Sequence, residues 1–394
     1  MRVYFAPCGI GLGHVGRCIP IAKRLMQMNA EVAFSTYRDA IRYVEKENLP
    51  LLEAPPVGVQ VKPDGSIDFE RTAVNPGPFI AFYKVMRQIN SEIKFIEHLK
   101  PDVVVSDSRA STILAARFLG VPRICILNQF QVIVPRRRRL LALARFADHM
   151  ALTLIGKVWT SGNTVLIPDF PPPYTISRGN LGIPKSYRKN VRLVGPILEV
   201  RPSQLPTQDA LRRKLGLPSD RPVVFVPISG PTKEKAFLTG VLRKILLDFP
   251  EDFEVVMSLG YPNADDKPVR YRNVTIFKWI PNRFEYLKSC DVVIARAGHG
   301  TITQAMCYGK PALLVPTPSH TEQINNAKQA QELGAAQIIM QNELNKERLL
   351  GAIRSVLESN MHGKLAALQG EVLRHDGLDN IVKAVVEMAK KQVF

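Results

Sequence analysis

Two apolar runs in the second half of the chain are each followed by a polar turn and then by a helical pattern. The runs cover residues 291–295 and 312–315, and the turns cover residues 298–301 and 317–323. Gly309, followed by a lysine and a proline, ends the helix between the runs, because glycine caps a helix and proline cannot continue one. This order predicts a parallel α/β sheet with both polar turns at the carboxyl ends of its strands, where such sheets bind small ligands.

The two polar turns suit a phosphorylated ligand. Gly298 and Gly300 allow the backbone to approach a ligand closely, and the start of the next helix offers free N–H groups and the positive end of its dipole. Gln304, Glu322 and Gln323 carry side chains that can bind hydroxyl groups. An ordinary βαβα segment is the alternative, but polar residues crowd the turns and not the elements between them, which favours a ligand site.

Strand and helix patterns alternate from residue 3 to the end of the chain, and 394 residues exceed one ordinary core. We therefore predict an α/β fold of two tandem Rossmann-like domains with an interdomain cleft. The expected N-terminal domain is 1–195, a proline-containing linker covers 196–206, and the C-terminal domain is 207–394. The last helix, 378–391, is expected to pack back toward the N-terminal domain.

The positive charge is unevenly distributed. The formal net charge is +18, and residues 1–195 hold 27 Lys and Arg against 14 Asp and Glu, a net of +13. This excess predicts an anionic partner for the first half, such as acidic lipid headgroups, a phosphate-bearing substrate or nucleic acid.

Several classes of site are not supported by the sequence. The five cysteines are scattered without a CxxC pair, which predicts neither a zinc site nor a disulfide framework and suits a reducing compartment. No carboxylate pair suggests a bound metal, and Ser229 lacks the GxSxG surroundings of a serine nucleophile. No apolar run reaches about 18 residues free of charge, so no transmembrane helix is expected.

A glycine-rich turn follows the first strand. Residues 11–16 match the GxGxxG pattern of dinucleotide-binding proteins, but the acidic residue that should end the second strand and hold the ribose is missing. His14 lies in the first turn of the helix that follows. A helix N-terminus disfavours added positive charge, which keeps an imidazole neutral and able to accept a proton. His14 is therefore a candidate general base, and a histidine that only caps or packs is the alternative.

These residues carry a resemblance to GT-B fold glycosyltransferases that spans nearly the whole chain. It is strongest at residues 8–14 (CGIGLGH), 279–281 (WIP) and 296–327, and weak at 55–78 and 129–190. The second half is most similar to the bacterial peptidoglycan N-acetylglucosaminyltransferase that acts on a muramyl-pentapeptide lipid. The chain also resembles the two-subunit eukaryotic enzyme that adds the second GlcNAc to dolichol pyrophosphate, and archaeal relatives of both.

The resemblance implies roles for the matching residues. It places His14 as the base on the acceptor hydroxyl, with Gly11, Gly13 and Asn128 on the acceptor side. The residues expected to bind the donor are Ser229, Gly230, Ile280, Arg296, Gly298, His299, Gly300, Thr301, Gln304, Glu322 and Gln323.

Within that set the resemblance assigns finer roles. Main chain at Ile280 contacts uracil, the turns at Ser229 and at His299 hold the diphosphate, and Glu322 with Gln323 binds the sugar hydroxyls. This chain departs from the family pattern at two places: Gln304 replaces a ribose-binding glutamate, and Glu322 replaces a glutamine. A neutral Gln304 makes weaker hydrogen bonds to a ribose than a carboxylate does.

The function implied is an inverting, metal-independent transfer of a sugar, with GlcNAc favoured, from a UDP-sugar to a polyprenyl- or dolichyl-linked acceptor. No cofactor is expected, and the pathway would be N-glycosylation or cell-envelope glycan synthesis. A UDP-sugar epimerase on the same fold is one alternative, but it would need more carboxylates around the sugar than Glu322. A basic nucleic-acid-binding protein is another, and no aromatic-interleaved basic face supports it, so we expect no nucleic acid partner.

One basic segment suggests where the protein works. Arg136, Arg137, Arg138 and Arg139 precede a mostly apolar helical pattern, residues 140–159, that Arg145 and Asp148 interrupt. Such a segment can lie on an anionic membrane surface but does not cross it. We therefore expect a cytoplasmic protein attached to the inner face of the cell membrane, although a solvated turn before a buried helix is the alternative.

Overall fold

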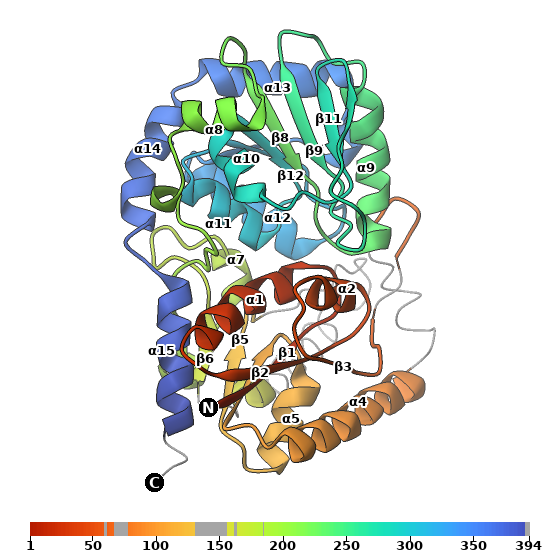
Figure 1. The fold of residues 1–394 in the computed structure, drawn as a ribbon, viewed down its shortest axis with the longest axis vertical. Coiled ribbons are helices and arrows are strands. Elements are labelled where there is room, and N and C mark those ends of the chain that lie inside the picture. Colours follow the sequence, from red (N-terminus) through yellow and green to blue (C-terminus); the bar gives the residue numbers. More distant parts are fainter. Residues whose placement is uncertain (59–60, 67–77, 131–155, 161–163, 184, 391–394) are drawn as a thin grey trace.

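The chain folds into two α/β lobes that face each other across a cleft (Figure 1). This computed structural model describes residues 1–394 apart from 59–60, 67–77, 131–155, 161–163, 184 and 391–394. Each lobe is built on a seven-stranded sheet. The predicted fold class, two tandem Rossmann-like domains, is confirmed.

The first lobe contains an all-parallel sheet in the order β3-β2-β1-β4-β5-β6-β7. Its strands are β1 (Arg2–Pro7), β2 (Glu31–Thr36), β3 (Leu51–Glu53), β4 (Val103–Asp107), β5 (Arg123–Ile126), β6 (Thr164–Ile167) and β7 (Val191–Leu193). Its helices are α1 (Gly13–Met26), α2 (Asp39–Lys46), α4 (Pro78–Leu99), α5 (Ala110–Phe118), α7 (Arg178–Leu181) and the 3-10 turn η1 (Lys185–Asn190).

The second lobe contains a sheet in the order β10-β11-β9-β8-β12-β13-β14, in which only the edge strand β10 is antiparallel. Its strands are β8 (Val223–Pro227), β9 (Glu254–Ser258), β10 (Val269–Tyr271), β11 (Val274–Phe277), β12 (Val292–Ala295), β13 (Ala312–Leu314) and β14 (Ala336–Ile338). Its helical elements are η2 (Pro202–Gln204), α8 (Gln208–Leu215), α9 (Thr232–Leu246), α10 (Arg283–Ser289), α11 (His299–Cys307), α12 (Thr321–Glu332), η3 (Gln341–Glu343), α13 (Lys346–Glu358) and α14 (Met361–Val372), and α15 (Gly377–Lys390) follows them in the chain.

Both sheets reverse their strand order at a central pair. In the first lobe the chain builds outward from β1 to β3 and then returns to place β4 on the other side of β1. In the second lobe the corresponding pair is β8 and β12. A reversal of this kind opens a crevice at the carboxyl ends of the two central strands, which is where such sheets bind ligands. The glycine-rich turn follows β1, and the turn at residues 296–298 follows β12.

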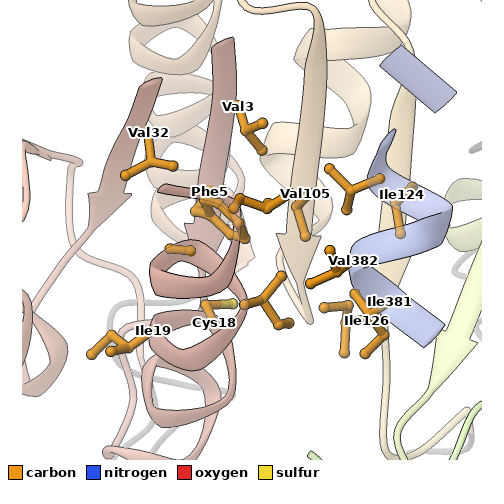
Figure 2. Close-up of a cluster of buried hydrophobic side chains, with 14 of the residues drawn as sticks. Val3, Phe5, Cys18, Ile19, Val32, Val105, Ile124, Ile126, Ile381 and Val382 are labelled. Atoms are coloured by element: carbon orange, nitrogen blue, oxygen red, sulfur yellow. The ribbon is translucent and has the colours of Figure 1, made fainter. Parts of the chain in front are cut away.

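The core of the first lobe includes the last helix of the chain. Figure 2 shows Phe5 of β1 next to α1, and Ile381 and Val382 of α15 beside Ile124 and Ile126 of β5, all within one buried cluster. The helix α15 therefore leaves the second lobe and completes the core of the first. Burying Ile381 fully gives this packing a contribution of about 2 kcal/mol from that side chain alone.

Two chain segments cross between the lobes side by side. Gly377 N donates to Pro196 O at 3.0 Å, and Asn380 Nδ2 donates to Val194 O at 2.8 Å. Arg201 Nη1 donates to Asp376 Oδ2 at 2.8 Å. The crossing that leads out of the first lobe is thus bonded to the crossing that returns to it.

The predicted membrane segment cannot be placed. Arginines 136–139 and residues 140–155 lie outside the described residues. In the part of the chain that the structure describes, no helix is both long and apolar enough to cross a membrane.

Candidate active site

The two crevices open into one pocket between the lobes. Its walls come from the turn after β1, the start of α1 and the end of β5 in the first lobe, and from the turns after β8, β11 and β12 and the start of α12 in the second. Every residue predicted to act in catalysis, donor binding or acceptor binding lines this pocket. They are Gly11, Gly13, His14, Asn128, Ser229, Gly230, Ile280, Arg296, Gly298, His299, Gly300, Thr301, Gln304, Glu322 and Gln323.

The glycine-rich turn lies directly against the second lobe. Gly11 has φ +71°, and a Cβ on it would lie 3.1 Å from Pro231. Glycine is therefore required there both by the backbone conformation and by the approach of the other lobe. Gly11 N donates to Asp39 Oδ2 at 3.2 Å, and Thr232 Oγ1 donates to the other oxygen of Asp39 at 2.8 Å. One carboxylate thus links the turn to the start of α9.

His14 is held by a carboxylate that the sequence analysis did not identify. Its Nδ1 lies 2.7 Å from Oδ1 of Asp107, the residue that ends β4. An ionised carboxylate only accepts, so Nδ1 carries the proton and Nε2 keeps its lone pair. The His14 side chain is 23% exposed, whereas that of Asp107 is fully buried. The imidazole therefore has one fixed and one free nitrogen, as a general base requires.

Arg17 shares the same carboxylate. One helical turn after His14, its Nε donates to Asp107 Oδ2 at 2.9 Å and its Nη2 donates to Oδ1 at 2.7 Å. Burial alone would raise the pKa of Asp107, but the charge of Arg17, together with the hydrogen bonds from His14 and Arg17, outweighs burial and brings that pKa to about 2. Asp107 therefore stays ionised throughout the neutral range.

Asn128 connects this cluster to the second lobe. Its Oδ1 accepts a long hydrogen bond from Arg17 Nη2 at 3.4 Å, and its Nδ2 donates to Glu322 Oε1 at 2.5 Å. Glu322 lies in the first turn of α12. A continuous polar chain therefore runs from the imidazole across the cleft to one of the predicted sugar-binding residues.

The start of α11 forms the opposite wall. Gly298, the N-cap residue, has no side chain to occupy the N–H groups of the first turn, and Gly298 to Thr301 all line the pocket. Unoccupied N–H groups at a helix N-terminus bind anions such as phosphate. The helix begins at His299 and not, as expected, after Thr301, so the predicted turn is itself the first turn of the helix.

His299 is paired with a carboxylate from the first lobe. Its Nε2 lies 3.1 Å from Oδ2 of Asp169, within ion-pair distance but without the alignment of a hydrogen bond. The N–H of Ser177 also donates to this oxygen at 2.7 Å. Burial would raise the pKa of Asp169, but His299 and Ser177 lower it. Among the described residues, Nδ1 of the buried His299 has no hydrogen-bond partner.

Two predicted donor residues are already engaged within their own lobe. Arg296 Nη1 donates to Val315 O at 3.1 Å, and its Nη2 donates to Gln341 Oε1 at 2.7 Å. The Gln323 side chain accepts from Thr317 N at 3.0 Å. These bonds hold both side chains in the pocket wall, so their remaining donors, and not the whole side chains, face a ligand.

The described residues contain no group of three or more His, Cys, Asp or Glu side chains that could hold a metal ion. Asp107, Arg17 and Asp169 were not among the site residues predicted from the sequence. For Asp107 a signal was present, because it directly follows the apolar run of β4, at the strand end where ligand sites of this fold lie.

Solved structures define the class of protein. Over 98% of both chains, this protein superposes on the glycosyltransferase of kitacinnamycin with a TM-score of 0.66 at 16% identity. It superposes on MurG of Acinetobacter baumannii with a TM-score of 0.56 at 19% identity, over 98% of this chain and 99% of that one. The fold is thus the GT-B fold of glycosyltransferases.

Sequence relatives define the family. The profile of the glycosyltransferase family 28 C-terminal domain matches residues 228–374. A Methanosarcina acetivorans protein described as an uncharacterized glycosyltransferase is 30% identical over 364 residues, which are 91% of this chain and 88% of that protein. The chain belongs to glycosyltransferase family 28. It is also 25% identical, over the whole of both chains, to the UDP-N-acetylglucosamine–N-acetylmuramyl-(pentapeptide) pyrophosphoryl-undecaprenol N-acetylglucosamine transferase of Desulforamulus reducens.

Proposed function

We propose that this glycosyltransferase moves a sugar, with GlcNAc as the first candidate, from a UDP-sugar to a lipid-linked acceptor with inversion and without a metal ion. The observation that carries the proposal is the arrangement of the pocket. A histidine with one fixed and one free nitrogen lines one wall, and an uncapped helix N-terminus lines the other. A base for the acceptor and an anion site for the leaving group are the two parts that such a transfer requires.

The proposed reaction is a single displacement. The acceptor oxygen attacks the anomeric carbon of the sugar, its proton passes to Nε2 of His14, and the bond from that carbon to the diphosphate oxygen breaks. The nucleoside diphosphate leaves with the electron pair of that bond. N–H groups at the start of α11, together with the glycines on either side of His299, would stabilise its growing charge.

The choice of donor is supported by the relatives. The Desulforamulus reducens protein, similar over its whole length, carries a UDP-N-acetylglucosamine donor in its name. We expect purified protein to show a higher melting temperature with UDP-GlcNAc than with GDP- or dTDP-sugars, because a ligand that binds the folded state stabilises it by mass action. Transfer that persists in excess EDTA would support the metal-free mechanism. Equal stabilisation by all the nucleotide sugars would contradict the choice of donor.

A surface on α4 supports attachment to a membrane. In the first half of this helix, Ile80, Phe82, Tyr83, Val85 and Met86 are exposed, and Phe82 is 66% exposed. Lys84 and Arg87 lie among them, and the exposed side chains of residues 82–90 include no acid. Phe118, 78% exposed, lies on the neighbouring helix α5. Large apolar and basic side chains together fit the interface of a bilayer that contains anionic lipid.

This attachment can be tested with vesicles. The double variant Phe82→Ser with Met86→Ser should cosediment less with vesicles of mixed phosphatidylglycerol and phosphatidylcholine, and Tyr271→Ser, which changes an exposed aromatic residue of β10, should not. Replacing arginines 136–139 by serine tests the segment predicted from the sequence. If the α4 variant binds as the parent does and the arginine variant does not, the membrane contact lies in that segment and not on α4.

A further inference from the structure

Arg17 is set into the base cluster in a way that the reaction alone does not explain. We infer that Arg17 is a positioning residue: it binds both oxygens of Asp107 and balances the negative charge of this carboxylate. Asp107 can then orient the His14 imidazole, while the positive charge of Arg17 offsets its electrostatic effect on the ring. The inference rests on the proposed role of His14 as the base, and the experiment below separates the two.

The geometry shows that the carboxylate is shared unequally. Arg17 makes two bonds to Asp107, at 2.9 and 2.7 Å, one to each oxygen, whereas His14 makes one at 2.7 Å. Such a bidentate pairing is the strongest that a guanidinium and a carboxylate form. Arg17 Nη2 also lies 2.9 Å from Nδ1 of His14. Because Nδ1 donates its proton to Asp107, Nη2 finds no acceptor there and places a positive charge beside the ring.

The charge matters because a base must give its proton up again. A lone buried carboxylate beside an imidazole strongly favours the protonated ring, which can no longer accept the acceptor proton. A cation beside the same ring disfavours that form. Asp107 and Arg17 together carry no net charge, so the pair holds the orientation and the tautomer of the ring without placing a net charge beside it.

Arg17 keeps its positive charge although it is largely buried in the cluster with Asp107. Its side chain is only 11% exposed, and burial opposes the charge, but Asp107 outweighs burial and raises the pKa of Arg17. Near the cluster also lie Glu322, reached through Asn128, and the thiols of Cys8, Cys18 and Cys125. Burial raises the pKa of all three thiols, which therefore stay neutral. Arg17 is thus the cation that balances Asp107.

The alternative is that Arg17 has a purely structural role, in which it only allows Asp107 to be buried. The two roles differ in their effect on the titration of His14. In protein labelled with [13Cε1]-histidine, the signal of His14 among the seven histidines can be assigned by its loss in His14→Gln. Arg17→Gln keeps N–H donors for Asp107 but removes the positive charge. Arg17→Lys keeps the charge but loses the bidentate geometry of the guanidinium. Arg42→Met, which removes an exposed arginine of α2, is the control.

We expect the titration midpoint of His14 in Arg17→Gln to rise by about one pH unit or more, since a charge within a few Å of a titrating group has an effect of that size. In Arg17→Lys the midpoint should move much less, and in Arg42→Met it should not move. A midpoint in Arg17→Gln that matches the parent, in protein with an unchanged melting temperature, overturns the inference. Arg17→Met, which lacks the N–H donors as well, provides a second neutral variant with the same expected direction.

The rate profile separates this inference from the proposed function. With UDP-GlcNAc as donor, the acid limb of the pH–rate profile of Arg17→Gln should shift to higher pH, as the NMR titration midpoint of His14 does. If the midpoint moves and the acid limb does not, Arg17 controls the titration of His14 but His14 is not the base. If neither moves, the inference itself fails.

Discussion

The two walls of the pocket are assembled from the chain in different ways. In the second lobe, eight of the eleven predicted donor residues come from one continuous segment, residues 296–323, and the other three come from the turns after β8 and β11. In the first lobe, His14 and Asp107 are 93 residues apart, and Arg17 and Asn128 are 111 residues apart. A continuous segment leaves a motif in the sequence, whereas a cluster gathered from several strand ends exists only in the fold.

The two walls also differ in their electrostatics. The first lobe places a buried ion pair, Asp107 with Arg17, beside a titratable ring. The second lobe places the backbone N–H groups of α11 beside the same space, together with His299, whose Nδ1 has no hydrogen-bond partner within the described residues. Under the proposed function, one wall handles a proton and the other handles a leaving anion. Substitutions in the two walls should therefore affect different kinetic quantities.

The largest effect is expected at the base. Replacing His14 by Ala should lower turnover with UDP-GlcNAc by about 10²-fold, the usual contribution of a general base, while the affinity for UDP measured by calorimetry stays the same. His98→Ala, on the exposed face of α4, is the matched control. Unchanged turnover, or an equal loss of UDP affinity, would remove the functional difference between the two walls.

The next effect concerns stability where the lobes meet. Glu234, in the first turn of α9, lies beneath the turn of the first lobe at Gly65, and Gln341 Nε2 donates to Asp64 O at 3.0 Å nearby. Burial raises the pKa of Glu234 from 4.5 to about 7, although Arg296 acts in the opposite direction. A raised pKa means that the stability contributed by the neutral acid is fully present below pH 4.5 and is lost as the pH rises through about 7.

The Glu234→Gln variant should not lose this stability as the pH rises, because a glutamine side chain does not ionise. We expect the free energy of unfolding of the parent to fall, relative to this variant, by on the order of 2 kcal/mol between about pH 5 and pH 8. Chemical denaturation of both proteins at the two pH values measures the difference. A constant difference across this range would show that Glu234 does not titrate in the folded protein.

A smaller effect is expected in the donor wall. Gln304→Ala should weaken UDP binding by about 1 kcal/mol, or about fivefold in Kd, because a hydrogen bond to the ribose is lost. Turnover at saturating donor should change little, in contrast to His14→Ala. Gln331→Ala, on the exposed part of α12, is the control for calorimetry. Equal affinity of parent and variant would show that Gln304 does not contact the nucleotide.

The smallest effect is expected where Asp39 joins the lobes. The exposed bond from Thr232 Oγ1 to Asp39 Oδ1, at 2.8 Å, should couple the two residues by about 0.5 kcal/mol. A double-mutant cycle of Thr232→Ala and Asp39→Ala in thermal unfolding measures this coupling. Strictly additive effects would show that this contact does not help to hold the lobes together.

The sequence predicted the fold well because each buried strand is a continuous apolar run with a turn signal at its end. The run at residues 291–295 and the glycines of the CGIGLGH turn are local signals of this kind, and both lie where the strand order reverses. The helix α14 was not predicted, because Gly363 and Gly370 weaken its helical pattern. The parts of the fold that depend on residues close together in the sequence could thus be predicted.

Contacts between strands that lie far apart in the sequence could not be predicted. Nothing in the sequence around Asp107 shows that His14 and Arg17 share it, since the three meet only when β1 and β4 pair. Similarly, the bond from Thr317 N to the Gln323 side chain could not be foreseen, because a turn sequence does not fix its side-chain conformations. Side-chain partners are decided by tertiary packing, which local patterns do not encode.

The paired crossings between the lobes determine how the pocket can move. A single connecting strand is a swivel, since rotation about its bonds leaves three angles free. Here the crossing near Pro196 and the crossing near Gly377 are bonded side by side, so twisting one lobe against the other would shear the bonds between them. Bending about an axis through both crossings would leave these bonds intact. We therefore expect the lobes to bend more easily than they twist, which would keep the two walls of the pocket in lateral alignment.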